Sequence, residues 1–147
     1  MKRVVVDTNV LVSAALLPGS RPAGILRACR GGALALVMSL GITEELEDVF
    51  ARPHIRKRFR VGDDEAREVL LAVMQGAAVM PGTAIAGAVP ADPRDDHVIS
   101  AAVEARADCI VTGDQHLLAL GSYDGIRILT PAQFLEQLDA ETPAVRE

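Results

Sequence analysis

Short apolar runs alternate with longer amphipathic stretches along nearly the whole chain. The runs, which are rich in Val, Leu and Ile, predict strands at residues 3–6, 34–38, 109–112 and 126–129, and a further apolar run covers 77–80. The stretches between them predict helices at residues 9–17, 21–30, 42–50, 64–76, 93–106, 115–120 and 131–138. Strands that are apolar on both faces and alternate with helices are typical of α/β proteins. The pattern therefore predicts a parallel sheet covered by helices on both faces.

Local signals mark the beginnings and ends of several elements. Ser20 and Asp63 are expected to cap the helices that follow them. Thr130 and Gln133 have the spacing of a capping box at the start of the last helix. Residues 81–91 form an uncharged loop that is rich in Pro, Gly and Ala.

The length and composition are those of one domain. The chain has 147 residues, so we expect a single domain over residues 1–138 and a flexible tail over 139–147. No apolar run reaches the roughly 18 residues that a membrane span needs. The apolar run near the N-terminus is too short for a signal peptide, so a cytoplasmic location is expected.

Charge and cysteine content restrict the chemistry further. The net charge is −5, so any contact with nucleic acid must be local or carried by a metal ion. Cys29 and Cys109 form no CxxC motif and are expected to be free, buried thiols.

Two acids directly follow predicted strands. Asp7 comes after the strand at 3–6, and Asp114 follows the strand at 109–112. The carboxyl ends of parallel strands meet at one edge of the sheet, where such proteins bind ligands. We therefore expect both carboxylates at this edge, although capping of the next helix is an alternative role for each.

Two further acids come from helices. Glu45 is the acid of the helix at 42–50 that lies nearest its apolar stripe, although a solvated shoulder position is an alternative. Asp92 and Asp95 have the spacing of residues that begin a helix, whereas no capping role needs Asp96. We therefore rank Asp96 above its neighbours as a site residue.

A cluster of these acids would need a cation. Neighbouring carboxylates repel one another strongly unless a positive charge lies between them. All-oxygen ligands suit Mg²⁺ or Mn²⁺, and the chain has no Cys and His set that would favour zinc. Two such ions can activate water and stabilise the leaving oxygen in phosphodiester cleavage. The acids thus lead to the hypothesis of a nuclease.

Several segments, in this order and spacing, resemble the motifs of PIN-domain proteins. They are VVVDTNVLVSA at 4–14, Glu45 followed by Leu46, DHVISA at 96–101, VTGD at 111–114 and RILTPAQFL at 127–135. The resemblance extends over roughly residues 3–138. It is closest to the VapC-like group, the toxin components of toxin–antitoxin pairs.

The resemblance implies a Rossmann-like PIN domain of three α/β/α layers, with a parallel sheet of about five strands. It implies four metal-binding and catalytic carboxylates: Asp7, Glu45, Asp96 and Asp114. It implies three polar residues that support them: Asn9, Ser13 and Thr112. Asp92 and Asp95 either add a ligand for a second metal ion or only cap the helix.

The implied activity is endoribonucleolysis by water activated on Mg²⁺ or Mn²⁺. The implied partners are an RNA substrate, an antitoxin and a second copy of the chain, and no membrane is involved. The alternative from another functional class is a catalytically inactive PIN-like module with an RNA-binding or regulatory role. Asn9 stands where a haloacid-dehalogenase-type phosphotransferase needs an acid, so that enzyme class is disfavoured.

A basic segment follows the helix at 42–50. Its five cations are Arg52, Arg56, Lys57, Arg58 and Arg60. They are candidates for phosphate contacts that bring RNA to an acidic protein. The alternatives are a solvated face and a docking site for an acidic antitoxin segment.

Overall fold

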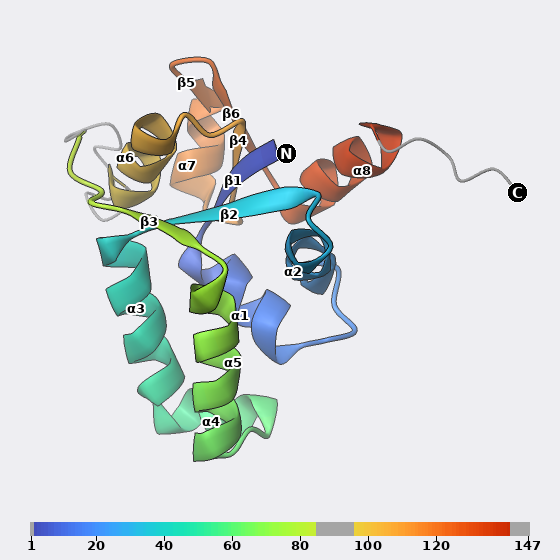
Figure 1. The fold of residues 1–147 in the computed structure, drawn as a ribbon, viewed down its shortest axis with the longest axis vertical. Helices are drawn as coiled ribbons and strands as arrows, with labels where there is room; N and C mark the ends of the chain where they lie inside the picture. Colours follow the sequence, from blue (N-terminus) through green and yellow to red (C-terminus); the bar gives the residue numbers. More distant parts are fainter. Residues whose placement is uncertain (1, 85–95, 142–147) are drawn as a thin grey trace, which may run out of the picture.

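The computed structural model describes residues 2–84 and 96–141 (Figure 1). The described strands form one six-stranded sheet in the order β3-β2-β1-β4-β6-β5. The strands are β1 (Lys2–Val6), β2 (Leu34–Ser39), β3 (Ala78–Met80), β4 (Cys109–Val111), β5 (Ser122–Tyr123) and β6 (Ile126–Leu129). Every pairing is parallel except that of β5 with β6. The predicted parallel sheet is thus confirmed.

Helices cover the sheet on both sides, as predicted. The described helices are α1 (Thr8–Leu16), α2 (Ala23–Arg30), α3 (Leu40–Ala51), α4 (Pro53–Phe59), α5 (Asp63–Gln75), α6 (Asp96–Ala105), α7 (Gln115–Leu120) and α8 (Pro131–Glu141). In Figure 1, α6 and α7 lie on one side of β2, and α1, α3 and α5 lie on the other. The architecture is the expected three-layer α/β/α arrangement.

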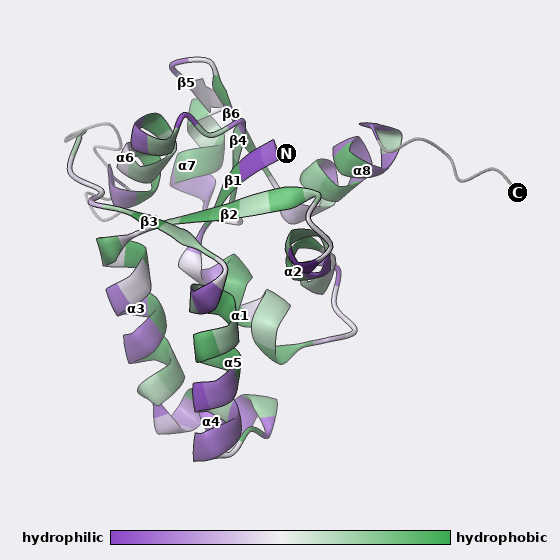
Figure 2. Cartoon of the chain, in the orientation of Figure 1, coloured by the Kyte–Doolittle hydropathy of each residue, from purple (hydrophilic) through white to green (hydrophobic). Residues whose placement is uncertain are grey.

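The central strand β1 anchors the core. Val4, Val5 and Val6 are fully buried, because β1 is flanked by β2 and β4 and covered on both faces. Figure 2 shows that apolar residues lie inside the molecule, as in β2, whereas α4 at one end of the molecule is largely hydrophilic. Burial of this branched aliphatic set supplies the main driving force for folding in a chain with few aromatic residues.

The sixth strand was not predicted. β5 is only two residues long and forms a hairpin with β6. Asp124 and Gly125 join the two strands with φ values of 51° and 81°, as a tight hairpin turn requires. The Asp-Gly pair in the sequence indicates a hairpin turn, but a strand of two residues is too short to show the alternating pattern by which strands are predicted.

The basic segment is also more regular than expected. It forms α4, which begins with Pro53 and buries none of its residues. Only Ile55 and Phe59 of this helix pack against the core, and both are partly buried. Two apolar residues are too short a pattern to predict a helix, so the sequence indicated only the charge of the segment.

Some predicted caps are correct and others are not. Thr130 and Gln133 form the predicted capping box, with reciprocal backbone-to-side-chain hydrogen bonds of 3.1 and 3.0 Å. Ser20 does not cap α2, because its hydroxyl donates to the carbonyl of Leu17 instead. Asp63 is the first residue of α5 and not its cap, a position occupied by Gly62.

The last helix reaches beyond its predicted end. α8 runs to Glu141, whose carboxylate lies 2.6 Å from the ammonium group of Lys2. This contact joins the described C-terminal helix to β1. Within the described residues, no helix is long and apolar enough to cross a membrane. Cys29 and Cys109 are free thiols, and Cys109 is buried whereas Cys29 is half-buried.

Candidate active site

Asp7 and Asp114 lie at the carboxyl edge of two neighbouring strands. β1 and β4 are parallel and pair Val6 with Val111, so both acids emerge on the same side of the sheet. The backbone N–H of Asp7 donates to the carbonyl of Val111 at 3.0 Å, which fixes the end of β1 against β4. The topology thus accounts for the closeness of the two acids.

Thr112 connects the two acids. Its side chain is fully buried, and its hydroxyl donates to Asp7 Oδ2 at 2.8 Å. The same hydroxyl oxygen accepts the backbone N–H of Asp114 at 3.0 Å. The Asp7 carboxylate is therefore oriented by a buried hydroxyl on the neighbouring strand.

Helix capping explains only one of the two carboxylates. Asp114 caps α7, because its Oδ1 accepts the N–H groups of His116 and Leu117 at 2.7 and 3.2 Å. Asp7 holds the cap position of α1, but its side chain makes no capping hydrogen bond. Capping therefore does not account for the carboxylate of Asp7.

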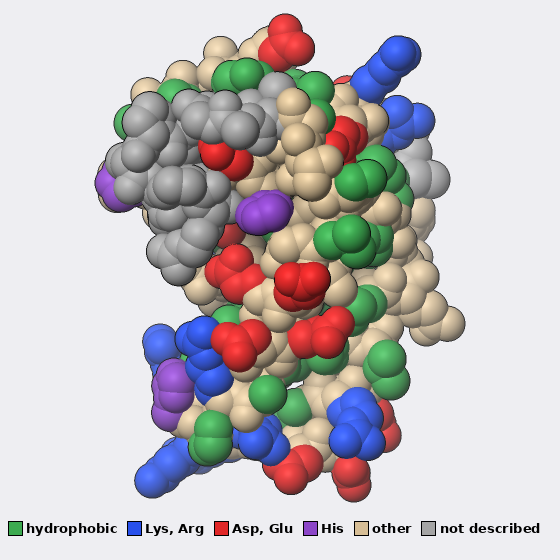
Figure 3. Space-filling view, turned by 90° about the vertical axis from the view of Figure 1, so that its left-hand side faces the viewer, with side chains coloured by type: hydrophobic (Ala, Val, Ile, Leu, Met, Phe, Trp, Pro, Cys, Tyr) green, Lys and Arg blue, Asp and Glu red, His purple; other side chains and the backbone are tan. Residues whose placement is uncertain are grey.

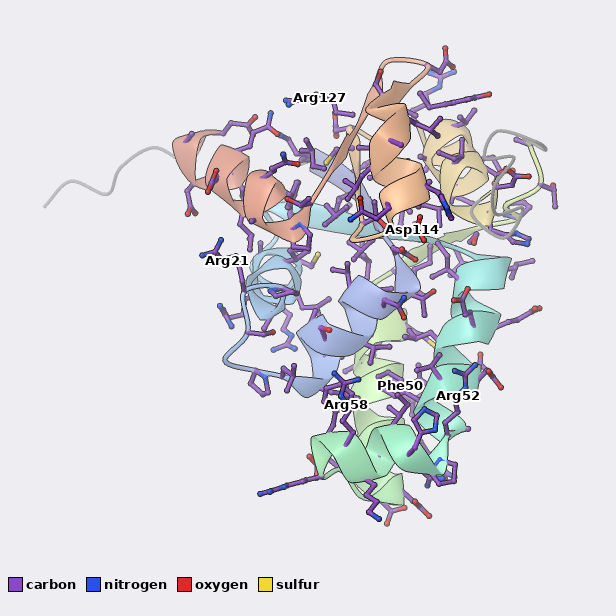
Figure 4. The ribbon with its side chains drawn as sticks, turned by 180° about the vertical axis from the view of Figure 1, so that it is seen from behind. Arg21, Phe50, Arg52, Arg58, Asp114 and Arg127 are labelled. Atoms are coloured by element: carbon purple, nitrogen blue, oxygen red, sulfur yellow. The ribbon has the colours of Figure 1, made fainter. Side chains whose placement is uncertain are left out.

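Both acids line one open cleft, with a volume of about 660 Å³. Asn9 and Ser13, two of the predicted supporting residues, project into it from α1. The remaining lining residues are Val10, Pro22, Gly113, Gln115 and His116. Figure 4 shows Asp114 at the start of α7, beside α1. The donors in this cleft are mainly carboxylate, amide and hydroxyl oxygens, which fit Mg²⁺ or Mn²⁺.

The other two predicted acids come from neighbouring helices. Asp96 is the half-buried first residue of α6, and Glu45 is an exposed residue of α3. α3 and α6 contact each other. In Figure 3, acidic side chains gather across the middle of the face that α3 and α6 present, and basic ones lie toward α4. Glu44 and Glu45 are both exposed, so burial does not distinguish these two acids.

The structure brings together Asp7, Thr112 and Asp114, and leaves the full four-acid cluster a prediction. Within residues 2–84 and 96–141, no group of three or more His, Cys, Asp or Glu side chains is arranged to hold a metal ion. Asp92 and Asp95 lie outside the described residues.

Sequence reasoning passed over Thr8. It follows Asp7 directly and is almost fully buried, at 1% exposure. Its hydroxyl is one of two buried side-chain polar atoms that lack a hydrogen-bond partner among the described residues. An unsatisfied buried hydroxyl costs about 1–3 kcal/mol. Its place between the candidates Asp7 and Asn9 was the only signal in the sequence.

The basic segment divides into paired and unpaired cations. Arg52 lies 2.7 Å from Asp48, and Arg56 forms an ion pair with Asp63. The other three cations are exposed and form no ion pair with another residue of the described part of the chain: Lys57, Arg58 and Arg60. Arg58 lies 5.3 Å from the centre of the Phe59 ring. Acids of the chain itself therefore pair with two of the five cations, Arg52 and Arg56.

Comparisons with known proteins agree with this arrangement. A solved structure of VapBC2 from Rickettsia felis, bound to a DNA fragment from their promoter, has a chain that superposes with a TM-score of 0.60. The match covers 86% of this chain and 96% of that one at 12% sequence identity, and so shows a shared fold. An uncharacterized protein of Methanocaldococcus jannaschii, MJ1680, is 26% identical over 145 residues, which are 93% of this chain and 92% of that protein.

The family assignment rests on the sequence itself. The family model of the PIN domain matches residues 3–116, which include the candidate acids from Asp7 to Asp114. The match extends over more than half of the chain and agrees with the observed α/β fold. This chain therefore belongs to the PIN-domain family.

Proposed function

We propose that the chain is a metal-dependent endoribonuclease. The observation that carries this proposal is the Asp7 carboxylate, which is held by Thr112 instead of capping α1 and opens on the same cleft as Asp114. This arrangement turns the carboxylate toward the cleft, and the capping of α1 does not use it. Membership of the PIN-domain family supports a nuclease that hydrolyses phosphodiester bonds.

Four carboxylates would hold Mg²⁺ or Mn²⁺: Asp7, Glu45, Asp96 and Asp114. A bound ion would supply a coordinated water of lowered pKa and positive charge to stabilise the leaving oxygen. Thr112 keeps one oxygen of Asp7 turned toward its own hydroxyl, so the other oxygen has a defined direction. Asn9 and Ser13 line the cleft and would donate to substrate or to the metal-binding carboxylates.

The cations of α4 support RNA as the substrate. Lys57, Arg58 and Arg60 would bind phosphates, whereas Arg52 and Arg56 are held by acids of the chain itself. Figure 4 shows Arg52 and Arg58 at the α4 end of the molecule. The 12 residues of α3 span about 18 Å, so these phosphates lie several nucleotides from the cleaved bond.

We further propose that the chain is the toxin of a toxin–antitoxin pair that acts on cytoplasmic RNA. The fold shared with a chain of the Rickettsia felis VapBC2 structure supports this reading. An antitoxin and a second copy of the chain would then be its protein partners.

The test is cleavage of a mixed RNA pool with Mg²⁺, Mn²⁺ or EDTA. We expect metal-dependent cleavage that falls by at least about 100-fold in Asp7→Asn and Asp96→Asn, because each substitution removes a charged ligand. Asp124→Asn is the matched control, since it makes the same change in the exposed β5–β6 turn, and it should cleave normally.

The opposite result has a definite meaning. A folded chain that cleaves no RNA with either metal, and whose melting temperature does not rise with Mn²⁺, would contradict the proposal. Retained RNA binding in that case would favour the inactive, RNA-binding module.

A further inference from the structure

The first turn of α3 and the first turn of α6 meet at Gly41 and His97. A Cβ atom at Gly41 would lie 2.7 Å from Cγ and 2.8 Å from Nδ1 of His97. An ordinary contact between carbon atoms is about 3.5–4.0 Å. The His97 ring therefore occupies space that any side chain at position 41 would need.

A second glycine lies beside this ring, which belongs to an exposed residue. Gly82 is buried at φ +78°, and a Cβ there would lie 2.7 Å from Cβ of Ser39 and 3.5 Å from Nδ1 of His97. We call Gly41 and Gly82 the two-glycine cradle of His97. The absence of a Cβ at Gly41 lets α3 approach the His97 ring of α6 closely, and its absence at Gly82 lets the segment after β3 approach Ser39, the cap residue of α3.

Glu104 joins the same segment to α6. Its carboxylate accepts the backbone N–H groups of Gly82, Thr83 and Ala84 at 2.7, 3.1 and 3.0 Å. Hydrogen bonds to a charged acceptor are about twice as strong as neutral ones. These hydrogen bonds therefore hold the Gly82 side of the cradle to α6.

The cradle lies beside two of the proposed metal ligands. Glu45 follows Gly41 by four residues, about one turn of α3, and Asp96 is the residue before His97. We infer that the contact between Gly41 and His97 sets the spacing of Glu45 and Asp96, so that His97 and Gly41 are positioning residues for metal binding. This inference rests on the proposed function.

The displacement that a methyl group at position 41 requires is larger than the displacement that metal binding tolerates. A methyl group at position 41 needs about 1 Å more room to reach an ordinary contact. Metal–ligand distances tolerate only about 0.2 Å. The clash is with Cγ, which is bonded directly to Cβ of His97, so bending of the outer ring alone cannot relieve it. Either α6 moves or the whole ring rotates away.

The experiment compares Mn²⁺ binding in four variants by calorimetry and by the metal-induced rise in melting temperature. Gly41→Ala should bind Mn²⁺ roughly 10- to 100-fold more weakly than the parent chain, as with other changes behind metal ligands. Gly24→Ala is the matched control in α2, because its Cβ would make only ordinary contacts at 3.5 Å, and its affinity should not change.

The double variant separates positioning from a general loss of structure. Gly41→Ala with His97→Ala removes the ring that the new methyl group would strike. We expect it to bind Mn²⁺ more tightly than Gly41→Ala alone and about as well as His97→Ala alone. All variants should show the circular dichroism spectrum of the parent.

Three results would overturn the inference. The first is a folded Gly41→Ala that binds Mn²⁺ as the parent does, which would mean that the ring rotates away harmlessly. The second is a double variant that binds no better than Gly41→Ala. The third is a parent chain that does not bind Mn²⁺ at all, and only this result would also overturn the proposed function.

Discussion

Thr112 is the residue on which the orientation of Asp7 depends. Its buried hydroxyl donates to one acid and accepts from the backbone of the other, so it uses both its donor and an acceptor position. No local rule of helix or strand formation requires a hydroxyl here. The pairing of β1 with β4 gives Thr112 its role.

Thr112→Val tests that role, because valine has the shape of threonine without the hydroxyl. We expect a loss of about 1–3 kcal/mol in the free energy of unfolding, since two buried hydrogen bonds lose their partner. Urea denaturation measures this loss, and calorimetry should show weaker Mn²⁺ binding. Thr112→Ser keeps the hydroxyl and should retain Mn²⁺ affinity. Equal affinity in Thr112→Val and the parent would contradict the role.

The two thiols make a pH-dependent prediction. Burial raises the pKa of Cys29 to about 11, partly opposed by Arg30, and burial also raises the pKa of Cys109 to about 11. At pH 8 about one thiol in 10³ is then ionised, so native protein should react slowly with iodoacetamide. Mass spectrometry with and without urea measures the difference. Equal rates in both conditions would contradict it.

The same raised pKa values affect stability at alkaline pH. The unfolded thiols ionise near their ordinary pKa of 9.0, whereas the folded ones ionise near 11. Their contribution to stability is therefore fully present below pH 9 and is lost as the pH rises toward 11, because only the unfolded state releases its protons in that interval. The urea midpoint should therefore be lower at pH 10 than at pH 8.

At the scale of elements, the sequence did not predict the helical form of α4, and it predicted α6 as a helix without predicting its position against other elements. α4 buries no residue fully, and its apolar stripe is only the pair Ile55 and Phe59, which pack partly buried against the core. α6 has an apolar face, yet its position depends on the two-glycine cradle and on Glu104, contacts between residues far apart in the chain. The hydrophobic pattern therefore predicts which residues form such a helix, but not where the helix packs in the fold.

The cations of α4 give a prediction at this scale. Replacing Lys57 and Arg58 by Gln, and Arg60 by Asn because its φ is +55°, should weaken RNA binding. The slope of log K against log salt should become shallower by about 0.7 for each phosphate that the variant no longer binds. Arg127→Gln, an exposed cation on β6, is the matched control (Figure 4). An unchanged salt dependence in the triple variant would contradict RNA contact at α4.

The paired cations should behave differently from the exposed ones. Arg52 and Arg56 neutralise Asp48 and Asp63, so their replacement would change local packing more than RNA contact. Exposed ion pairs contribute at most about 1 kcal/mol, so the change in stability should be small.

At the scale of the whole molecule, an acidic chain presents two differently charged regions. Acidic side chains gather across the middle of the face that α3 and α6 present, and basic ones lie toward α4 (Figure 3). The α4 end also carries acids at the start of α5: Asp63, Asp64 and Glu65. This separation lets metal ions and RNA phosphates be attracted to different parts of one surface. A net charge of −5 therefore does not oppose the proposed nuclease.

The sequence by itself determined the α/β class, the central strands, the capping box at α8 and the placement of Asp7 and Asp114 at the carboxyl edge. Each follows from local spacing or from the common direction of parallel strands. Only the tertiary structure decided which helix caps are real, that Asp7 is bound by Thr112, and that His97 packs against Gly41. These depend on distances between segments that are far apart in sequence, and periodicity carries no information about such distances.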